Sequence, residues 1–438
     1  MTARAPGSTQ SLGVLNSLRT HLLLVLLIAL NFLNFVDRYL LKGFANDVIS
    51  DLGLTYLQFG LLTGIVFSVF YSTCGLFIGI IADHFNRLKV IAAGAMIWSA
   101  LTALTGVARG FPDIALARAF IGVGESALTP ASLSLIKDIF PPRRLALVTS
   151  LYYLGVPLGT GFSVVVAGLL GPSLGWRGTF ILLGMAGVVL SLLVLLFREP
   201  RRQSGTPSAI NFRTSFQALA RTLAGSPALR YLILASVLMQ FSLGGDVFEQ
   251  VWLVNERGFD SQSARLIFGS IYLVAATIAL ILGGLLADWL GARHPQGKLH
   301  ALLIAALFLV PTLLFRITPP DLPFFYVFAV LSSMFASLTI GPYYSSIQEL
   351  SPAHMRSTVL AFVLLATTLV GFSLGSAVFG MLTDAFTSWG LAQPLSVAMM
   401  VVNGIGLLSI PAVLLAIRHH KGSELPEIAE PLASARGR

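Results

Sequence analysis

The segment Asn31-Phe-Leu-Asn-Phe-Val-Asp37-Arg38 decides the fold, because it places two opposite charges at the end of a long apolar run. That run, residues 22–35, has the composition of a helix that crosses a membrane. A charged side chain in the hydrocarbon layer costs at least about 2.5–3.5 kcal/mol. We therefore expect Asp37 and Arg38 to pair inside a helical bundle or to line a water-filled path.

The composition of the chain is that of an integral membrane protein. Of its 438 residues, 55% are hydrophobic and 11% are charged, against about 25% charged in an ordinary soluble domain. The apolar runs are continuous and do not alternate with polar residues, which favours helices over a transmembrane barrel. We predict an all-α integral membrane fold with 12 transmembrane helices in two pseudo-symmetric six-helix bundles. The expected spans are about 20–42, 56–82, 88–108, 112–138, 144–169, 177–197, 229–254, 263–290, 299–316, 323–349, 357–382 and 395–417.

The net charge of +9 is spread over alternate loops and is not gathered on one face. This is the positive-inside pattern, so the basic balance indicates membrane orientation and not a nucleic-acid partner. We expect both termini in the cytoplasm, and short loops without a glycosylation sequon fit a bacterial inner membrane. Cys74 is the single cysteine, and we expect neither a metal site nor a cofactor.

The chain divides into two similar halves. We expect an N-terminal six-helix bundle over 1–197, a cytoplasmic linker over 198–228, a C-terminal six-helix bundle over 229–418 and a cytoplasmic tail over 419–438. In the linker an apolar stripe opposite several arginines predicts either a helix on the membrane surface or a plain amphipathic connection. The stripe consists of Phe212, Phe216, Leu219 and Leu223.

An internal repeat relates the halves. The segment Gly79-Ile-Ile-Ala-Asp83 recurs as Gly284-Leu-Leu-Ala-Asp288, in the same order along each half. Counted from the helix starts, Asp37 corresponds to Asp246. Two halves related by duplication predict a central cavity at their interface.

A second set of charges lies in the span 112–138, where Arg118 and Glu125 are seven residues apart and share a helix face. With Asp37 and Arg38 they form two acids and two bases that can neutralise one another. One interpretation is that these pairs only hold helices together. In the other, which we favour, Glu125 releases Arg38 or Arg118 when protonated and pairs again when ionised. Asp37, Glu125 and Arg118 are then proton-coupling residues.

Arg38 is our candidate for binding an anionic group of a substrate, because a guanidinium offers a fork of hydrogen-bond donors. Asp37 would orient it. Asn31 and Asn34 share its helix face and either bind substrate or bond to neighbouring helices. Tyr152 and Tyr153 offer amphipathic rings to a cavity, although such rings more often pack or anchor at the membrane interface.

Asp246 and Glu249 are a further pair of acids, three residues apart near the end of the span 229–254. They are either a second proton or cation site, or the solvated outer end of this helix.

Two motifs resemble a known family. The segment 79–89, Gly-Ile-Ile-Ala-Asp-His-Phe-Asn-Arg-Leu-Lys, resembles the cytoplasmic signature of the major facilitator superfamily, and Arg118-Ala-Phe-Ile-Gly-Val-Gly124 resembles its helix 4 motif. The segments 34–38, 118–126 and 157–161 resemble the spinster branch. The signature predicts a latch that holds the halves in the outward-open state. Its gating residues are Gly79, Asp83, Arg87, Lys89 and Asp288.

The resemblance implies a secondary active transporter that works by alternating access. The spinster branch further implies proton coupling and a lipid-like substrate, a lysophospholipid or a sphingoid phosphate, with membrane lipids around a monomer. The alternative is a proton-coupled carrier of a small organic anion or a drug exporter. A different class is a membrane receptor or scaffold that does not transport. The chain lacks a P-loop and an HExxH motif, so we expect neither ATP-driven transport nor an enzyme.

Overall fold

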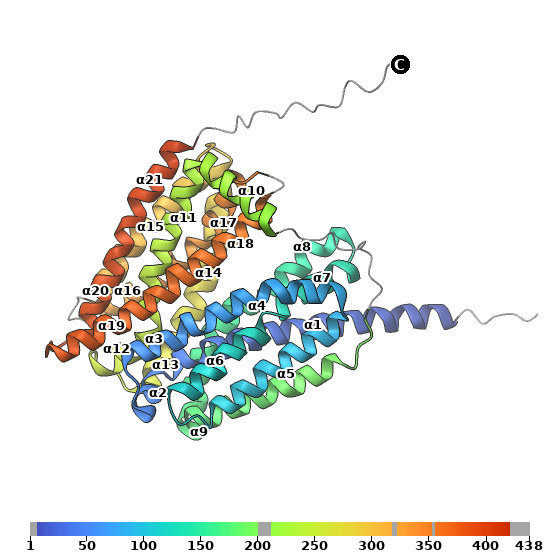
Figure 1. Ribbon diagram of the computed structural model, residues 1–438, viewed down its shortest axis with the longest axis horizontal. Helices are drawn as coiled ribbons and strands as arrows, with labels where there is room; N and C mark the ends of the chain where they lie inside the picture. The colour runs from blue at the N-terminus through green and yellow to red at the C-terminus, as the bar shows by residue number, and fades with distance from the viewer. Residues whose placement is uncertain (1–6, 200–211, 318–321, 353–354, 421–438) are drawn as a thin grey trace, which may run out of the picture.

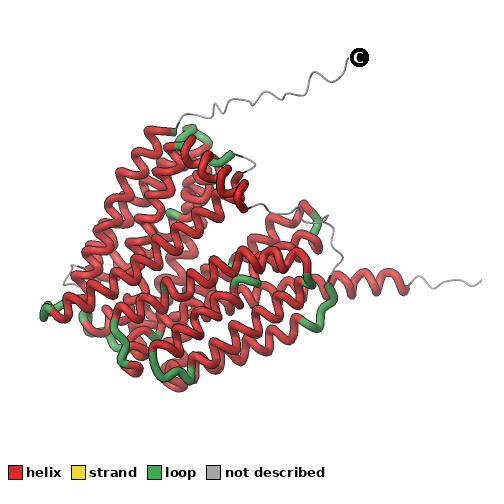
Figure 2. The backbone as a smooth tube through the Cα atoms, in the orientation of Figure 1, coloured by secondary structure: helices red, strands yellow, loops and turns green. Residues whose placement is uncertain are grey.

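The computed structural model describes residues 7–199, 212–317, 322–352 and 355–420, and all regular structure in these ranges is helical. The helices form two bundles, shown in blue to green and in green to red in Figure 1, and the tube in Figure 2 shows only short loops between them. The predicted fold class is therefore confirmed. Residues 200–211 of the expected linker and 421–438 of the expected tail lie outside the described ranges.

The N-terminal bundle consists of α1 to α9. Their bounds are α1 (Gly7–Gly43), α2 (Ala45–Leu52), α3 (Tyr56–Thr63), α4 (Ile65–His84), α5 (Arg87–Thr105), α6 (Phe111–Glu125), α7 (Leu128–Ile139), α8 (Pro142–Tyr153) and α9 (Gly155–Val194). Several expected spans are each made of two helices in line, such as α3 with α4 and α6 with α7. Interrupted spans of this kind line the binding sites of many transporters.

The C-terminal bundle runs from α11 to α21, and the helix α10 (Phe212–Gly225) precedes it. Its elements are α11 (Pro227–Ser242), η1 (Leu243–Phe248), α12 (Glu249–Asn255), α13 (Ser261–Ile271), η2 (Tyr272–Ala276), α14 (Thr277–Gly291), α15 (Gly297–Ile317), α16 (Leu322–Leu338), α17 (Ile340–Leu350), α18 (Arg356–Leu365), η4 (Ala366–Ser373), α19 (Leu374–Ser388), α20 (Pro394–Ile405), η5 (Gly406–Leu408) and α21 (Ser409–His419). The elements η2 and η4 are π-helical turns, a feature that is frequent at functional sites.

Twelve membrane crossings follow from the helix lengths. The described residues contain 11 stretches that are long and apolar enough to cross a membrane, and one of them, Arg143–Val194, has 52 residues. At about 1.5 Å per residue this stretch is nearly twice as long as a bilayer is thick. It contains two crossings, because Gly175 adopts a left-handed φ of 63° inside α9 and breaks the helix there. The expected gap between the spans 144–169 and 177–197 lies at this residue.

The linker helix α10 only partly follows the predicted stripe. Leu219 is buried and Leu223 packs against the same hydrophobic cluster of the C-terminal bundle. Phe216, however, is 70% exposed. The side chain of Phe212 lies outside the described part of the structure.

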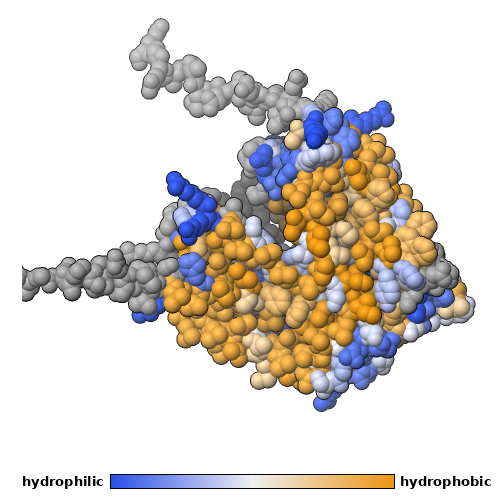
Figure 3. All heavy atoms as spheres, turned by 180° about the vertical axis from the view of Figure 1, so that it is seen from behind, coloured by the Kyte–Doolittle hydropathy of each residue, from blue (hydrophilic) through white to orange (hydrophobic). Residues whose placement is uncertain are grey.

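The two bundles meet on one side and diverge on the other. We call the side that carries α2 and the start of α3 the joined side, and the side that carries α8 and α10 the open side (Figure 1). On the joined side α3 packs against α19 and α9 packs against α13. The space-filling view in Figure 3 shows a notch between the bundles and a broad apolar outer surface.

Hydrogen bonds between the two bundles stabilise the joined side. The carboxylate of Asp384, on α19, accepts hydrogen bonds from the backbone N–H groups of Tyr56 and Leu57, both at 2.9 Å. A carboxylate at a helix N-terminus satisfies free donors and complements the helix dipole. Nearer the membrane centre, the hydroxyl of Ser373 donates to that of Ser68 at 2.8 Å. The start of α3 is thus capped by a residue of the opposite bundle.

We predict that Asp384→Ala opens the joined side. Loss of a helix cap costs about 1–2 kcal/mol, which corresponds to a rise of roughly five- to thirtyfold in the open population. The measurement is the labelling rate of Thr63→Cys, in a Cys74→Ser background, by a maleimide that cannot cross the membrane and is added on the joined side. Asp260→Ala is the matched control, because Asp260 caps α13 within its own bundle. Equal labelling rates in the two variants would show that Asp384 does not hold the bundles together.

Candidate functional site

Arg38 and Glu125 form a buried ion pair inside the N-terminal bundle. Arg38, on α1, donates from Nε and Nη2 to the same oxygen, Oε2 of Glu125 on α6, at 2.9 and 2.6 Å. The Glu125 side chain is fully buried and that of Arg38 is 17% exposed. Charge-assisted hydrogen bonds of this length are strong. The structure thus brings together the two residues on which the transport hypothesis depends.

Glycines allow this close arrangement of helices. A Cβ placed on Gly124 of α6 would lie 2.9 Å from the backbone nitrogen of Trp98, and one on Gly122 would lie 2.8 Å from the carbonyl oxygen of Phe67. Only a residue without a side chain lets α6 approach both α5 and α4 so closely. Because Glu125 follows Gly124 directly, these contacts fix the depth of its carboxylate in the bundle.

Aromatic rings enclose the guanidinium of Arg38. Its Cζ lies 4.8, 4.9 and 4.6 Å from the ring centres of Phe35, Phe67 and Tyr71. A cation close to aromatic rings is stabilised by their quadrupoles, most strongly where water is excluded. Arg38 is therefore held by the Glu125 carboxylate and an aromatic cage, and a ligand that binds its Nε and Nη2 competes with Glu125.

Arg118 joins the cluster through the backbone. Its Nε donates to the carbonyl oxygen of Leu62 at 3.3 Å, and its Nη2 donates to that of Arg38 at 3.4 Å. The Phe67 ring lies between the two arginines, 4.8 Å from the Arg118 Cζ. Of the two arginines considered for Glu125, Arg38 is the one in contact.

Asp37 is buried beside α5, not against Arg38. Its carboxylate faces Trp98 and Thr102, and within the described residues neither oxygen has a hydrogen-bond partner. The Asn34 side chain interacts with the Glu125 carboxylate, although its amide nitrogen and Oε1 of Glu125 do not reach the geometry of a standard hydrogen bond. The expectation that Asp37 orients Arg38 is not supported by this geometry, because the two side chains make no bond. Buried polar atoms without well-formed hydrogen bonds are costly, and here several of them lie around one site.

The two asparagines have different surroundings. Asn34 accepts a hydrogen bond from Nη2 of Arg38 at 3.4 Å and belongs to the charged cluster. Asn31 is buried and donates to the backbone oxygen of Tyr152 at 2.8 Å, so it joins two helices. The Tyr152 ring is buried, whereas Tyr153 is 43% exposed.

A second charged cluster lies between the bundles. Arg316 donates from Nη1 to Oε1 of Glu249 at 2.7 Å, and Nζ of Lys42 lies 3.5 Å from Oε2 of Glu249. Asp246 interacts electrostatically with Lys42, Glu249 and Arg316. Glu249 is therefore neither isolated nor solvated. The sequence signal that was overlooked is the position of Lys42, one helical turn after Arg38 on the same face of α1.

Among the described contacts of the signature segment, Arg87 forms ion pairs with a residue of the N-terminal bundle and with one at the start of the linker. Arg87 is buried, and it pairs with Asp138 at 2.5 Å and with Glu199 at 2.9 Å. Sequence reasoning did not single out either partner. Lys89 and Asp288 are exposed, and the side chains of Gly79 and Asp83 lie outside the described part of the structure. The predicted latch thus stays a prediction, although the open side has the separation that a released latch would show.

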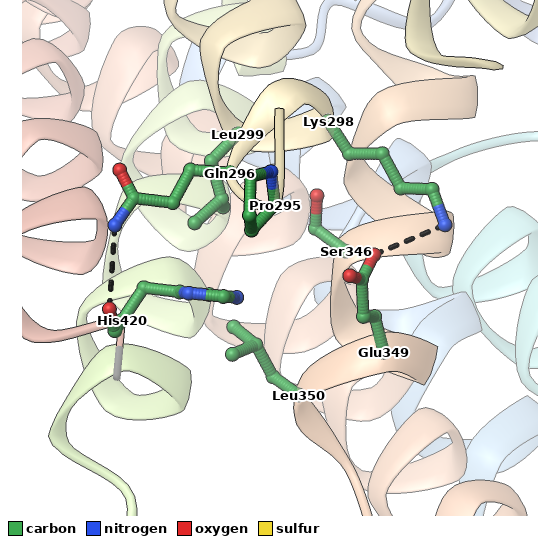
Figure 4. Close-up of a pocket in the computed structure, with 8 residues that line it drawn as sticks. All are labelled: Pro295, Gln296, Lys298, Leu299, Ser346, Glu349, Leu350 and His420. Carbon is green, nitrogen blue, oxygen red and sulfur yellow. Dashed lines mark hydrogen bonds and ion pairs between the residues drawn. The ribbon is translucent and has the colours of Figure 1, made fainter. Parts of the chain in front are cut away.

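A small pocket lies at the end of the C-terminal bundle near α17 (Figure 4). Its volume of about 10 Å³ holds roughly one water molecule and no substrate. Lys298 and Glu349 pair beside it at 3.0 Å. In the described ranges no three His, Cys, Asp or Glu side chains are grouped as metal ligands would be.

Comparison with known proteins identifies the family. Residues 27–371 match the Major Facilitator Superfamily. The chain belongs to this superfamily. It is a secondary transporter and not an enzyme. The segment Gly371-Phe-Ser373-Leu-Gly375 has the spacing of a hydrolase nucleophile motif, but it lies within membrane helices.

Individual relatives are distant but match along most of the chain. An MFS-type efflux pump of Mycolicibacterium smegmatis is 28% identical over 373 residues, 84% of this chain and 86% of that protein. The sphingosine-1-phosphate transporter SPNS2 of Danio rerio is 23% identical over 435 residues, 92% of this chain and 86% of that protein. A solved bacterial homologue of the human lysosomal transporter Spinster, inward-facing and unoccupied, has a TM-score of 0.82 at 23% identity and covers 92% of this chain and 97% of its own. The predicted resemblance to the spinster branch is thus confirmed.

We predict that Glu125→Ala lowers the free energy of unfolding by about 3–5 kcal/mol, because it leaves the Arg38 guanidinium without its charged partner. Glu125→Gln keeps an oxygen acceptor and has a smaller effect. Chemical denaturation in detergent measures both. The control is Glu349→Ala, which breaks the exposed pair with Lys298 and costs about 0–1 kcal/mol. A loss of stability in Glu125→Ala no larger than in this control would contradict the structural importance of the buried pair.

Proposed function

We propose that this transporter couples protons to the movement of a lipid-like amphiphile by alternating access. The substrate class is a lysophospholipid or a sphingoid phosphate, with an anionic head and an acyl tail. The single observation that carries the proposal is the buried pair of Arg38 and Glu125 at 2.6 Å. A buried pair that a proton can break is the element that proton coupling requires.

The proposed cycle exchanges the partner of Arg38. While Glu125 is ionised, it neutralises Arg38 and competes with any anionic ligand. Protonation of Glu125 removes this competition, and the guanidinium then binds the phosphate or carboxylate of the substrate. Asn34, already within hydrogen-bond distance of Arg38, gives a further polar contact. Asp37, Arg118 and Tyr153 complete the proposed site.

The proposed orientation places the open side in the cytoplasm. The loops and helix ends at that side carry much of the positive charge, including Arg143, Arg144, Arg293 and Arg356, as the positive-inside rule requires. The conformation described here is then inward-open, and both termini are cytoplasmic. A bacterial inner membrane is the proposed location.

The second candidate is a drug exporter or a carrier of a small organic anion, and the matching efflux pump supports it. The two differ in the depth of the cavity: an acyl chain needs an apolar compartment beyond the charged site, whereas a small anion does not. A receptor or scaffold, the third candidate, would bind ligand without flux.

Flux into proteoliposomes tests the proposal. A panel of a lysophospholipid, a sphingoid phosphate and a sugar acid is measured with and without a pH gradient. We expect the wild type to move an amphiphile faster with the gradient, and Glu125→Gln to lose this dependence because its side chain cannot ionise. Glu349→Gln, which alters an exposed ion pair, is the control, and its flux should still depend on the pH gradient.

Flux of the sugar acid alone would establish the second candidate. Binding of amphiphile without flux would establish a receptor. An undiminished pH response in Glu125→Gln would remove Glu125 from the coupling mechanism.

A further inference from the structure

Lys42 is a residue of the N-terminal bundle that takes part in a charged cluster of the C-terminal bundle. Its ammonium lies 3.5 Å from Oε2 of Glu249 and 5.7 Å from the ring centre of Tyr272. The side chains of Lys42 and Glu249 are each only 14% exposed. The other oxygen of Glu249 accepts a hydrogen bond from Arg316 at 2.7 Å. Lys42 therefore bridges the interface on the joined side.

The cluster is electrically balanced only while the bundles touch. In the state in which both acids are ionised, Asp246 and Glu249 contribute two negative charges, and Arg316 and Lys42 contribute two positive charges. Three of these residues belong to the C-terminal bundle and one, Lys42, to the N-terminal bundle. When the joined side opens, Lys42 leaves with α1, and the C-terminal bundle keeps one negative charge that is not compensated.

An uncompensated charge at this depth opposes opening. Breaking a buried pair by removing one partner is strongly unfavourable, and charged groups inside the membrane are costly without a partner. The pair of Arg38 and Glu125 has no such effect, because both of its members belong to the N-terminal bundle and move together. Opening of the joined side thus requires a substitute for the positive charge of Lys42.

We propose that Lys42 is an exchangeable counter-ion, whose place a proton takes at Asp246 or Glu249 when the joined side opens. This inference rests on the alternating access of the proposed function, and it places a second proton step at the interface itself. The groups that interact with the acids are Lys42 on α1, Tyr272 on η2 and Arg316 on α15, and Tyr39 on α1 interacts in turn with Tyr272. Lys42 is thereby a positioning residue for the conformational change, distinct from the substrate-binding Arg38.

The test uses the labelling of Thr63→Cys from the joined side, in the Cys74→Ser background, without any substrate. In the otherwise unchanged protein we expect labelling to become faster as the pH falls, because protonation of the acids releases Lys42. Lys42→Met removes the charge that must be exchanged, and its labelling should be at least about fivefold faster near neutral pH and independent of pH. Glu249→Gln added to Lys42→Met should cause little further change, since both act on one interaction.

Two controls make the outcome specific. Lys298→Met removes a lysine that also pairs with a glutamate, Glu349 at 3.0 Å, but both residues belong to one bundle. The labelling rate of this variant should still depend on pH. Lys42→Arg retains the positive charge, and its labelling rate should also depend on pH. If Lys42→Met does not fold, Glu249→Gln alone is the test variant, and it should weaken the pH dependence of labelling.

Labelling of Lys42→Met that matches the unchanged protein at every pH would overturn the proposal. This outcome is separate from failure of the proposed function, which would appear as an absence of proton-dependent flux while the labelling still responds to Lys42.

Discussion

The neutralisation of charges within an apolar bundle is the constraint on which this structure depends. Lipid offers no water to a charged or polar group, so each acid and each base needs a partner from the protein. Arg38 and Glu125 satisfy this need inside one bundle, and Lys42, Glu249 and Arg316 satisfy it between the two bundles. The pair of Arg38 and Glu125 therefore moves with its bundle. The contact of Lys42 with Glu249, in contrast, must break whenever the bundles separate on the joined side.

The two sides of the molecule are held in different ways. On the joined side, Asp384 caps α3 from the opposite bundle, and the Ser68 and Ser373 hydroxyls meet near the centre. These are short polar contacts between rigid helices, each of modest free energy, and rotation of the bundles can break them together. On the open side, Arg87 pairs with Asp138 of its own bundle and with Glu199 at the start of the linker. The ion pairs of Lys42 with Glu249 and of Arg265 with Asp47 also cross between the bundles on the joined side. The joined side thus combines hydrogen bonds and ion pairs that opening of this side must break.

The sequence predicts the architecture well, because apolar runs of the right length are a direct consequence of the bilayer. It also predicts that Glu125 pairs with an arginine inside the bundle, but it leaves Arg38 and Arg118 as alternatives, and only the structure shows that the partner is Arg38. It does not predict that Glu249 pairs with Lys42, because that contact depends on how the bundles dock, which no local pattern records. The environment of Asp37 could not be predicted either, because one residue along a helix turns the side chain by about 100°, away from Arg38 and toward α5.

Cross-linking across the joined side tests the central claim most directly, namely that transport requires the bundles to part there. Ser68→Cys and Ser373→Cys, in a Cys74→Ser background, replace two hydroxyls that lie 2.8 Å apart on opposite bundles. We predict that oxidation of this pair stops flux in proteoliposomes, that reduction restores it, and that each single-cysteine variant transports under both conditions. Full flux through the oxidised, cross-linked protein would contradict the account.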